Sequence, residues 1–114
     1  MSAEPRELDP PAGLFLVAYR HSGAIGCGGV KHRAGKPSEI KRLWVAESAR
    51  GLGIARRLLA KLEAEAMRSG ASAVRLETNG TLIESIAMYR SSGYVEVAPF
   101  NDEPFAHYWF EKAL

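Results

Sequence analysis

Two glycines in front of a long amphipathic helix constrain this chain most strongly. Gly51 and Gly53 follow a strand-like segment that ends at Val45, and a helical pattern of apolar residues begins near Leu52. Glycine lets the backbone turn tightly and approach a ligand without a Cβ in between, and the free N–H groups of the following helix point to the same place. The sequence therefore predicts that this turn and helix N-terminus bind an anion such as a phosphate.

The charges around the turn support the same prediction. A helix N-terminus carries about +0.5 of an elementary charge and favours Asp or Glu in its first turn. Arg50, Arg56 and Arg57 surround this one instead. Three cations there are unfavourable unless a multiply charged anion, such as a pyrophosphate or a 3′-phosphate, binds among them. The alternative is three solvated arginines around a purely structural glycine turn.

Two common classes of phosphate site do not fit the residues. The chain has no Gly-x-x-x-x-Gly-Lys-Ser/Thr segment, which a nucleoside triphosphate site of the P-loop type requires. A dinucleotide-binding fold requires Gly-x-Gly-x-x-Gly, and Arg56 stands where the third glycine would be. The segment before the turn is also too polar for a buried parallel strand. The phosphate ligand therefore belongs to another class.

Four segments of the chain carry a family resemblance. Arg50-Gly-Leu-Gly-Ile-Ala55 resembles the Arg/Gln-x-x-Gly-x-Gly/Ala motif of the GNAT superfamily, the acetyl-CoA-dependent N-acetyltransferases. The segment from Ser85 to Tyr94 is similar to the later family motif Ala-x-x-x-Tyr-x-x-x-Gly-Phe/Tyr, with Ser85 at the small position. Residues 39–45 and 107–112 resemble the fourth and last family strands. The segments stand in the family order, so the chain is identified as a short GNAT form.

The resemblance and the residue patterns together predict a mixed α/β sheet with the element order ββ-β-α-β-α-β-β. Alternating or apolar runs predict strands over residues 14–19, 25–30, 39–45, 73–77, 94–97 and 105–112. An apolar stripe at a spacing of 3.6 predicts a helix over about 52–68, which Gly70 ends. A shorter helix is predicted over about 82–92.

The third predicted strand contains a break in its alternation. Ile40 cannot share a face with Leu43 and Val45 at a strict period of two, and a β-bulge near Arg42 would restore the phase. Such a bulge would bend the strand away from its parallel neighbour, which gives the splay between the fourth and fifth family strands. The resemblance implies that the pantetheine arm of coenzyme A lies in this opening, along Leu43 to Val45.

Composition and length narrow the functional class. The 114-residue chain has the length of one domain, and its net charge of +2 is too small and scattered to indicate nucleic-acid binding. No segment has the roughly 18 apolar residues that a membrane helix needs, and the first residues lack a signal-peptide pattern. We expect a cytoplasmic protein with no metal site.

Cys27 has no second cysteine to pair with and is expected to be a buried small residue.

The first thirteen residues differ from the rest of the chain. They are rich in charge and contain Pro5, Pro10 and Pro11, so we expect a flexible polar arm over residues 1–13 before a single domain over 14–114. The GNAT pattern normally opens with a strand and one or two helices that help to wall the acceptor site. Without them, the strand over 14–19 is expected to be an exposed edge, covered by a partner chain, an exchanged segment or the arm. We expect a homodimer.

The resemblance implies acetyl transfer to a primary amine by direct attack in a ternary complex. The reaction requires a neutral amine, a polarised carbonyl group and a proton for the departing thiolate. Tyr89 is the expected proton donor, although its ring could instead simply pack under the sheet. Glu39 is the first choice for the base, with Glu77 and His107 as alternatives. The backbone N–H of Val45 is expected to polarise the carbonyl group.

The resemblance also implies a set of residues that bind acetyl-CoA. They are Leu43, Trp44, Val45, Arg50, Gly51, Leu52, Gly53, Ile54, Ala55 and Arg56. The family often has Asn seven residues before the tyrosine, where this chain has Leu82, and Asn79 could replace it only if its loop folds back. The acceptor, a small molecule or a peptide, is not identified by the sequence. Two alternatives are a catalytically inactive acyl-CoA-binding module and a fragment that needs a partner to complete the acceptor site.

Overall fold

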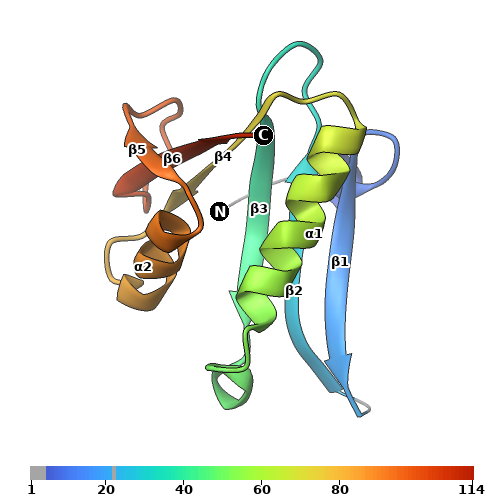
Figure 1. Cartoon of the computed structure of the whole chain (residues 1–114), viewed down its shortest axis with the longest axis vertical. Helices are drawn as coiled ribbons and strands as arrows, with labels where there is room; N and C mark the ends of the chain where they lie inside the picture. The colour runs from blue at the N-terminus through green and yellow to red at the C-terminus, as the bar shows by residue number, and fades with distance from the viewer. Residues whose placement is uncertain (1–4, 22) are drawn as a thin grey trace.

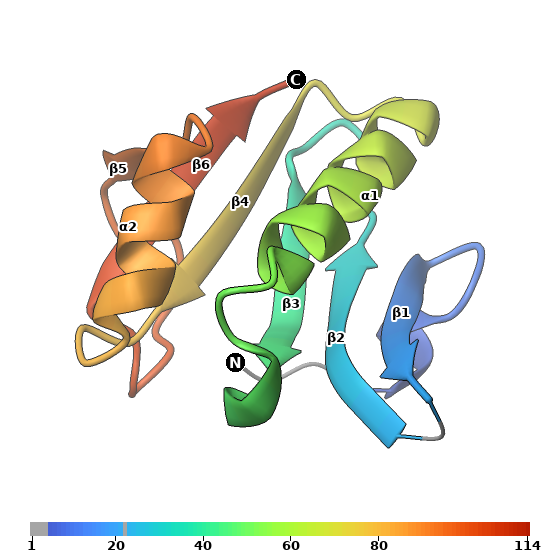
Figure 2. The ribbon, with the colours of Figure 1, turned by 60° about the horizontal axis from the view of Figure 1, so that its bottom comes forward.

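A computed structural model describes residues 5–21 and 23–114 of the chain. Within these residues six strands form one mixed sheet in the order β1-β2-β3-β4-β6-β5. Helices α1 and α2 lie on one face of this sheet (Figures 1 and 2). The bounds are β1 (Gly13–Arg20), β2 (Gly23–Lys31), β3 (Ser38–Val45), α1 (Ile54–Arg68), β4 (Ala73–Thr78), α2 (Ile83–Ser91), β5 (Val95–Val97) and β6 (Tyr108–Ala113), with short 3-10 helices η1 (Pro5–Leu8) and η2 (Glu47–Ala49). The predicted class and element order are confirmed.

The last strand is shorter than predicted. It begins at Tyr108 and not at Phe105, because its partner β4 ends at Thr78 and Tyr108 pairs with that residue. The preceding residues form a loop that is attached to the end of β4 by hydrogen bonds. The His107 N–H donates to the Thr78 carbonyl oxygen at 2.9 Å, and the Asn79 amide donates to the Phe105 carbonyl oxygen at 2.8 Å.

The core lies between the sheet and the two helices. The apolar stripe of α1 buries Leu58, Leu59, Leu62 and Ala66, as a period of 3.6 requires. Phe110 of β6 is fully buried in the same cluster. After α1, Gly70 has a φ of 100°, and the Ala71 N–H donates to the Ala66 carbonyl oxygen. These contacts form the C-terminal cap that the sequence predicts.

The predicted bulge is present in β3, where the phase of the alternation breaks. Cys27 of β2 is opposite Trp44 and Gly29 is opposite Lys41, so Gly28 stands opposite two residues, Arg42 and Leu43. Arg42 has a φ of 56°, which is unusual for a residue other than glycine. A Cβ on Gly28 would lie 2.9 Å from a methyl carbon of Leu43. The close approach explains why β2 has a glycine at this position.

Beyond its first residues, β3 separates from β4. The two strands pair in parallel only at Ser38 with Val74 and at Glu39 with Arg75. Figure 2 shows the two strands diverging from this point. The splay between the strands that correspond to the fourth and fifth family strands is therefore confirmed.

Residues 5–13 make contacts that the sequence analysis did not anticipate. Leu8 is buried against Gly29, where an added Cβ would lie 2.9 Å from a Leu8 methyl carbon. Glu7 also forms an ion pair of 2.7 Å with Lys31. Leu8 finds this site because Gly29 leaves room for it on β2. The rest of the predicted arm, residues 1–4, lies outside the described residues, and the division at residue 13 stays a prediction.

The predicted edge is found at β1, which is the first strand in the order of the sheet. Phe15, Val17 and Tyr19 on this strand are exposed. In the described part of the chain, no helix combines the length and apolar character needed to cross a membrane. The homodimer stays a prediction.

Candidate active site

A cleft of about 700 Å³ opens between the second half of β3, the N-terminal end of α1 and the first turns of α2. Nine of the ten residues predicted to bind the cofactor line it, and the tenth, Leu52, is exposed and does not. The other lining residues are Ala49, Thr81, Leu82, Ile83, Glu84, Ser85, Met88 and Tyr89. The cleft therefore joins the glycine turn to the second motif segment.

The glycine turn has the geometry of an anion cradle. Gly51 and Gly53 have φ values of 83° and 75°, and a Cβ on either residue would meet no heavy atom within 4 Å. Gly53 is the N-cap of α1, so no side chain caps the first N–H groups of this helix, and its first turn has no acidic residue. These N–H groups and the positive end of the helix dipole therefore face open space, which suits a phosphate group.

Arg56 connects the two helices at the rim of the cleft. Its guanidinium group donates to the Ser91 hydroxyl at 2.6 Å and to the Ser92 hydroxyl at 3.1 Å. Both serines stand at the C-terminal end of α2. The two hydrogen bonds hold the guanidinium group near the N-terminus of α1, where it adds positive charge to the cradle. The sequence predicted Arg56 but not its serine partners.

Tyr89 belongs both to the core and to the cleft. It projects from α2, is 3% exposed and lines the cleft. Its ring packs against Tyr94 and Phe110, with centroid distances of 5.8 Å and 6.0 Å. Burial, and secondarily the charge of Glu77, raises the pKa of Tyr89 to about 12. The phenol therefore stays protonated at neutral pH. Packing under the sheet and a position at the cleft, which the sequence analysis treated as alternatives, occur together.

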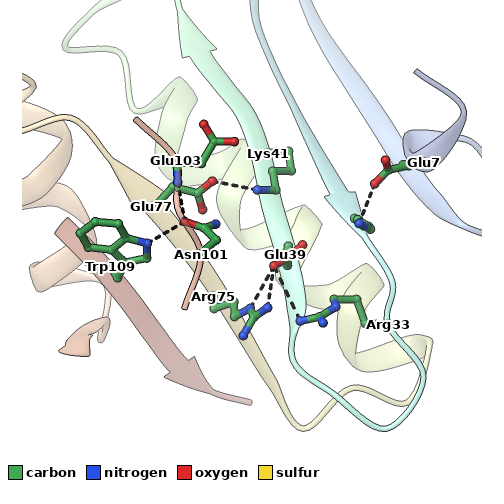
Figure 3. Close-up of polar contacts among 10 residues, drawn as sticks. Glu7, Arg33, Glu39, Lys41, Arg75, Glu77, Asn101, Glu103 and Trp109 are labelled. Atoms are coloured by element: carbon green, nitrogen blue, oxygen red, sulfur yellow. Dashed lines mark hydrogen bonds and ion pairs between the residues drawn. The ribbon is translucent and has the colours of Figure 1, made fainter. Parts of the chain in front are cut away.

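Glu39 lies on the face of the sheet opposite the helices (Figure 3). Its Oε2 accepts two hydrogen bonds from Arg75, at 2.8 Å and 3.0 Å, and Arg33 approaches the same atom at 3.7 Å. Glu39 is not among the residues that line the cleft. The structure therefore places this candidate base in an ion-pair network, away from the cleft.

The two alternative bases, Glu77 and His107, do not line the cleft either, and they have different surroundings. Glu77, at 1% exposure, is buried, and its Oε1 accepts a hydrogen bond of 2.8 Å from the Lys41 ammonium group. His107 is exposed, and its Nδ1 accepts a hydrogen bond of 2.9 Å from the Gly80 N–H. Because this bond occupies Nδ1, His107 holds the loop between β4 and α2 in place. Lys41 was not singled out in the sequence, although its alternation with Glu39 put the two residues on one face.

The first turns of α2 contribute lining residues that the sequence analysis missed. Thr81, Ile83, Glu84 and Met88 all face the cleft, and their position within the second motif segment or just before it was the only signal for them. Asn79 does not replace Leu82, because its side-chain oxygen accepts hydrogen bonds from the backbone N–H and the hydroxyl of Thr81. Leu82 itself lines the cleft.

The chain is similar to a known family and to known proteins. Residues 2–94 match the model of the acetyltransferase (GNAT) family. An IAA acetyltransferase from Azospirillum brasilense is 42% identical over 87 residues, which are 75% of this chain and 57% of that protein. The chain spans about three fifths of the length of the curated relatives that it matches.

Solved structures share the fold. A protein from Klebsiella pneumoniae, named as an acyl-CoA N-acyltransferase, is 30% identical and superposes with a TM-score of 0.83, covering 97% of this chain and 79% of its own. A Bacillus anthracis structure in complex with acetyl coenzyme A is 18% identical, with a TM-score of 0.83 over 100% of this chain and 69% of its own. At 18% identity, the likeness to the Bacillus anthracis structure shows a shared fold and nothing further.

Proposed function

Because the chain belongs to the acetyltransferase (GNAT) family, we propose that it transfers an acetyl group from acetyl-CoA to a primary amine, by direct attack in a ternary complex. The observation that carries this proposal is the N-terminus of α1. Its N–H groups are uncapped, two glycines with positive φ precede it, and it faces a cleft that also contains Tyr89. A phosphate-bearing ligand fits this arrangement better than any neutral ligand.

The residues of the cleft suit coenzyme A along its length. The backbone N–H groups from Arg50 to Arg56 would hold the pyrophosphate, and the two arginine side chains would add charge-assisted hydrogen bonds. The pantetheine arm would lie along Leu43 to Val45, where β3 has left β4 and its backbone groups are free to bind an extended chain. When bound, acetyl-CoA supplies an acyl group that is activated as a thioester.

The chain itself supplies the acid, the electrophilic contact and the base. Tyr89 would donate the proton that the thiolate needs, since its raised pKa keeps the phenol protonated. The Val45 N–H, next to the bulge, would donate a hydrogen bond to the oxygen on which negative charge develops. Glu39, Glu77 and His107 are the candidates for the base that removes a proton from the acceptor amine. Each of these roles is a proposal about a single side chain or backbone group.

The acceptor is a primary amine of a small molecule or a peptide. The acceptor wall that other family members build before the first hairpin has no counterpart in the described residues, and a second copy of the chain in a homodimer would be one way to supply it. A location in the cytoplasm is part of the same proposal. The rival function, acyl-CoA binding without turnover, differs in a single measurable property, which is the release of free thiol.

Two measurements test the proposal. Calorimetry with coenzyme A should show binding, and a thiol-release assay with acetyl-CoA should show turnover on at least one member of a panel of primary amines, diamines and lysine peptides. Binding without thiol release on any amine would favour the rival function. No heat with millimolar coenzyme A would refute both functions. Sedimentation of the same sample would report whether the active species is a dimer.

A further inference from the structure

Arg56 stands between two helix ends of opposite polarity. It lies in the first turn of α1, at the cleft, and its guanidinium group reaches the C-terminal end of α2. A cation in the first turn of a helix is unfavourable, whereas a cation beside the last carbonyl groups of a helix is favourable. The end of α2 therefore offsets the electrostatic cost of an arginine at the cradle.

The hydroxyl group of Ser91 is fixed in its orientation. Its Oγ donates a hydrogen bond of 3.0 Å to the Met88 carbonyl oxygen, so the hydroxyl hydrogen is directed at that carbonyl group. A lone pair of the same oxygen accepts the hydrogen bond of 2.6 Å from Nη2 of Arg56. The Oγ of Ser92 accepts the second hydrogen bond, of 3.1 Å, from Nη1. The two serines thus hold one planar guanidinium group at two points.

These hydrogen bonds leave part of the guanidinium group available to a ligand. A guanidinium group carries five N–H donors, and the two serines accept from two of them. Guanidinium groups bind phosphate oxygens through paired N–H donors in one plane, so the orientation of that plane matters. A side chain that is already held in one orientation also loses less conformational freedom when an anion binds. Arg56 is therefore prepared for a phosphate group before the ligand arrives.

We propose that Ser91 and Ser92 are positioning residues for phosphate recognition, because they hold the Arg56 guanidinium group in the orientation in which it binds a phosphate group of coenzyme A. The serines act through Arg56 and do not themselves contact the phosphate. They are 35 and 36 residues from Arg56, so α2 and not the glycine motif supplies this part of the site. The inference rests on the proposed binding of coenzyme A and does not depend on turnover.

Two other roles for the serines have different signatures. If the serines hold the guanidinium group away from the ligand, their hydrogen bonds compete with the phosphate, and loss of the hydroxyl groups would strengthen binding. If the serines only fix the end of α2, their loss would change protein stability or the placement of Tyr89, which α2 carries. Affinity for coenzyme A would then stay the same. The sign and the site of the effect therefore distinguish the three roles.

The test is a double-mutant cycle on coenzyme A binding, measured by calorimetry. Its members are the wild type, Arg56→Ala, Ser91→Ala/Ser92→Ala and the variant that combines all three substitutions. Alanine keeps the backbone hydrogen bonds that close α2, such as the one from the Ser92 N–H to the Met88 carbonyl oxygen. Urea unfolding of each variant reports whether its fold is retained.

Two matched controls come from the other end of α1. Arg68→Ala removes a guanidinium group that donates to Glu65 at 2.6 Å, and Ser69→Ala removes a hydroxyl group that donates to the Ala66 carbonyl oxygen at 2.7 Å. Neither residue lines the cleft. Both controls should bind coenzyme A like the wild type.

We expect the double serine variant to bind coenzyme A about fivefold more weakly than the wild type, and Arg56→Ala about tenfold more weakly. In the Arg56→Ala background the serine substitutions should have no further effect, since the serines act through that side chain. Unchanged or tighter binding by the double serine variant would overturn the inference. A fivefold loss that persists in the Arg56→Ala background would overturn it as well.

The thiol-release assay adds a readout that a purely structural role would not move. Acetyl-CoA carries phosphate groups and S-acetylpantetheine carries none. For the double serine variant, kcat/KM should fall about fivefold on acetyl-CoA, through KM, and stay within about twofold of the wild type on S-acetylpantetheine. An equal loss on the two donors, or a loss in kcat alone, would overturn the inference, because the serines would then act on α2 and not on the phosphate.

Two results separate this inference from the function on which it rests. If the wild type does not bind coenzyme A, the proposed function fails and the inference falls with it. If the wild type binds coenzyme A but releases no thiol on any amine, acetyl transfer fails, and the calorimetric cycle still decides the inference. If the double serine variant does not fold, Ser91→Ala and Ser92→Ala are measured singly. Each should then weaken binding in the wild type and have no effect in the Arg56→Ala background, and the opposite pattern overturns the inference.

Discussion

Replacing Gly53 with alanine tests whether the glycine turn contributes to ligand binding or only to the conformation of the backbone. The residue has a φ of 75°, in the left-handed region, and an added Cβ would meet no heavy atom within 4 Å. The substitution therefore costs backbone strain and no clash, about 1–2 kcal/mol of folding free energy. For a chain of this size that corresponds to a fall in Tm of about 4 °C per kcal/mol.

Gly53 lines the cleft at the N-terminus of α1, so the added Cβ would stand beside the N–H groups that coenzyme A is proposed to approach. We expect Gly53→Ala to bind coenzyme A at least about tenfold more weakly, which is about 1.4 kcal/mol. Gly35→Ala is the matched control. Gly35 has a φ of 70° in the turn between β2 and β3, an added Cβ there also meets nothing within 4 Å, and it does not line the cleft.

Urea unfolding and calorimetry with coenzyme A separate the two effects. Both variants should lose similar folding free energy, and only Gly53→Ala should lose affinity. If the two variants bind coenzyme A equally well, the turn at Gly53 is a structural turn and the assignment of the cradle is wrong. If Gly35→Ala loses no stability while Gly53→Ala loses 1–2 kcal/mol, the strain estimate from the positive φ is wrong.

Three further outcomes are expected. Tyr89→Phe should bind coenzyme A like the wild type and turn over more slowly in the thiol-release assay, and an unchanged rate would remove Tyr89 from the mechanism. Burial raises the pKa of Tyr89 to about 12 and also raises that of Tyr94, so the stabilisation is present below pH 10 and is lost as pH rises through the folded-state values. Urea titrations between pH 10 and 12 should show the free energy of unfolding falling by about 1.4 kcal/mol per pH unit for each tyrosine, and Tyr89→Phe should reduce that slope. Phe110→Ala should cost about 3–5 kcal/mol, since this ring is fully buried between sheet and helices, and a loss below 1 kcal/mol in the same titration would contradict its place in the core.

The features that the sequence predicted correctly are local. The stripe of α1 and its cap at Gly70 follow from residues within a few positions of one another, and so does the bulge at Arg42. The segment proposed to bind coenzyme A is also nearly continuous, from Leu43 to Arg56, so its motif could be read without knowledge of the fold. The largest error in a strand boundary, at Phe105, occurred where the length of the strand depends on its partner.

The sequence by itself thus determined the class of the sheet, the order of its elements and the turn that faces the cleft, because periodicity and turn chemistry act between near neighbours in the chain. Only the tertiary structure decided which side chains meet across the splay. Lys41 and Glu77 are 36 residues apart, and so are Arg56 and Ser92. Such pairs depend on strand register and on where α2 packs, and these follow from burial of the whole core and not from any local pattern.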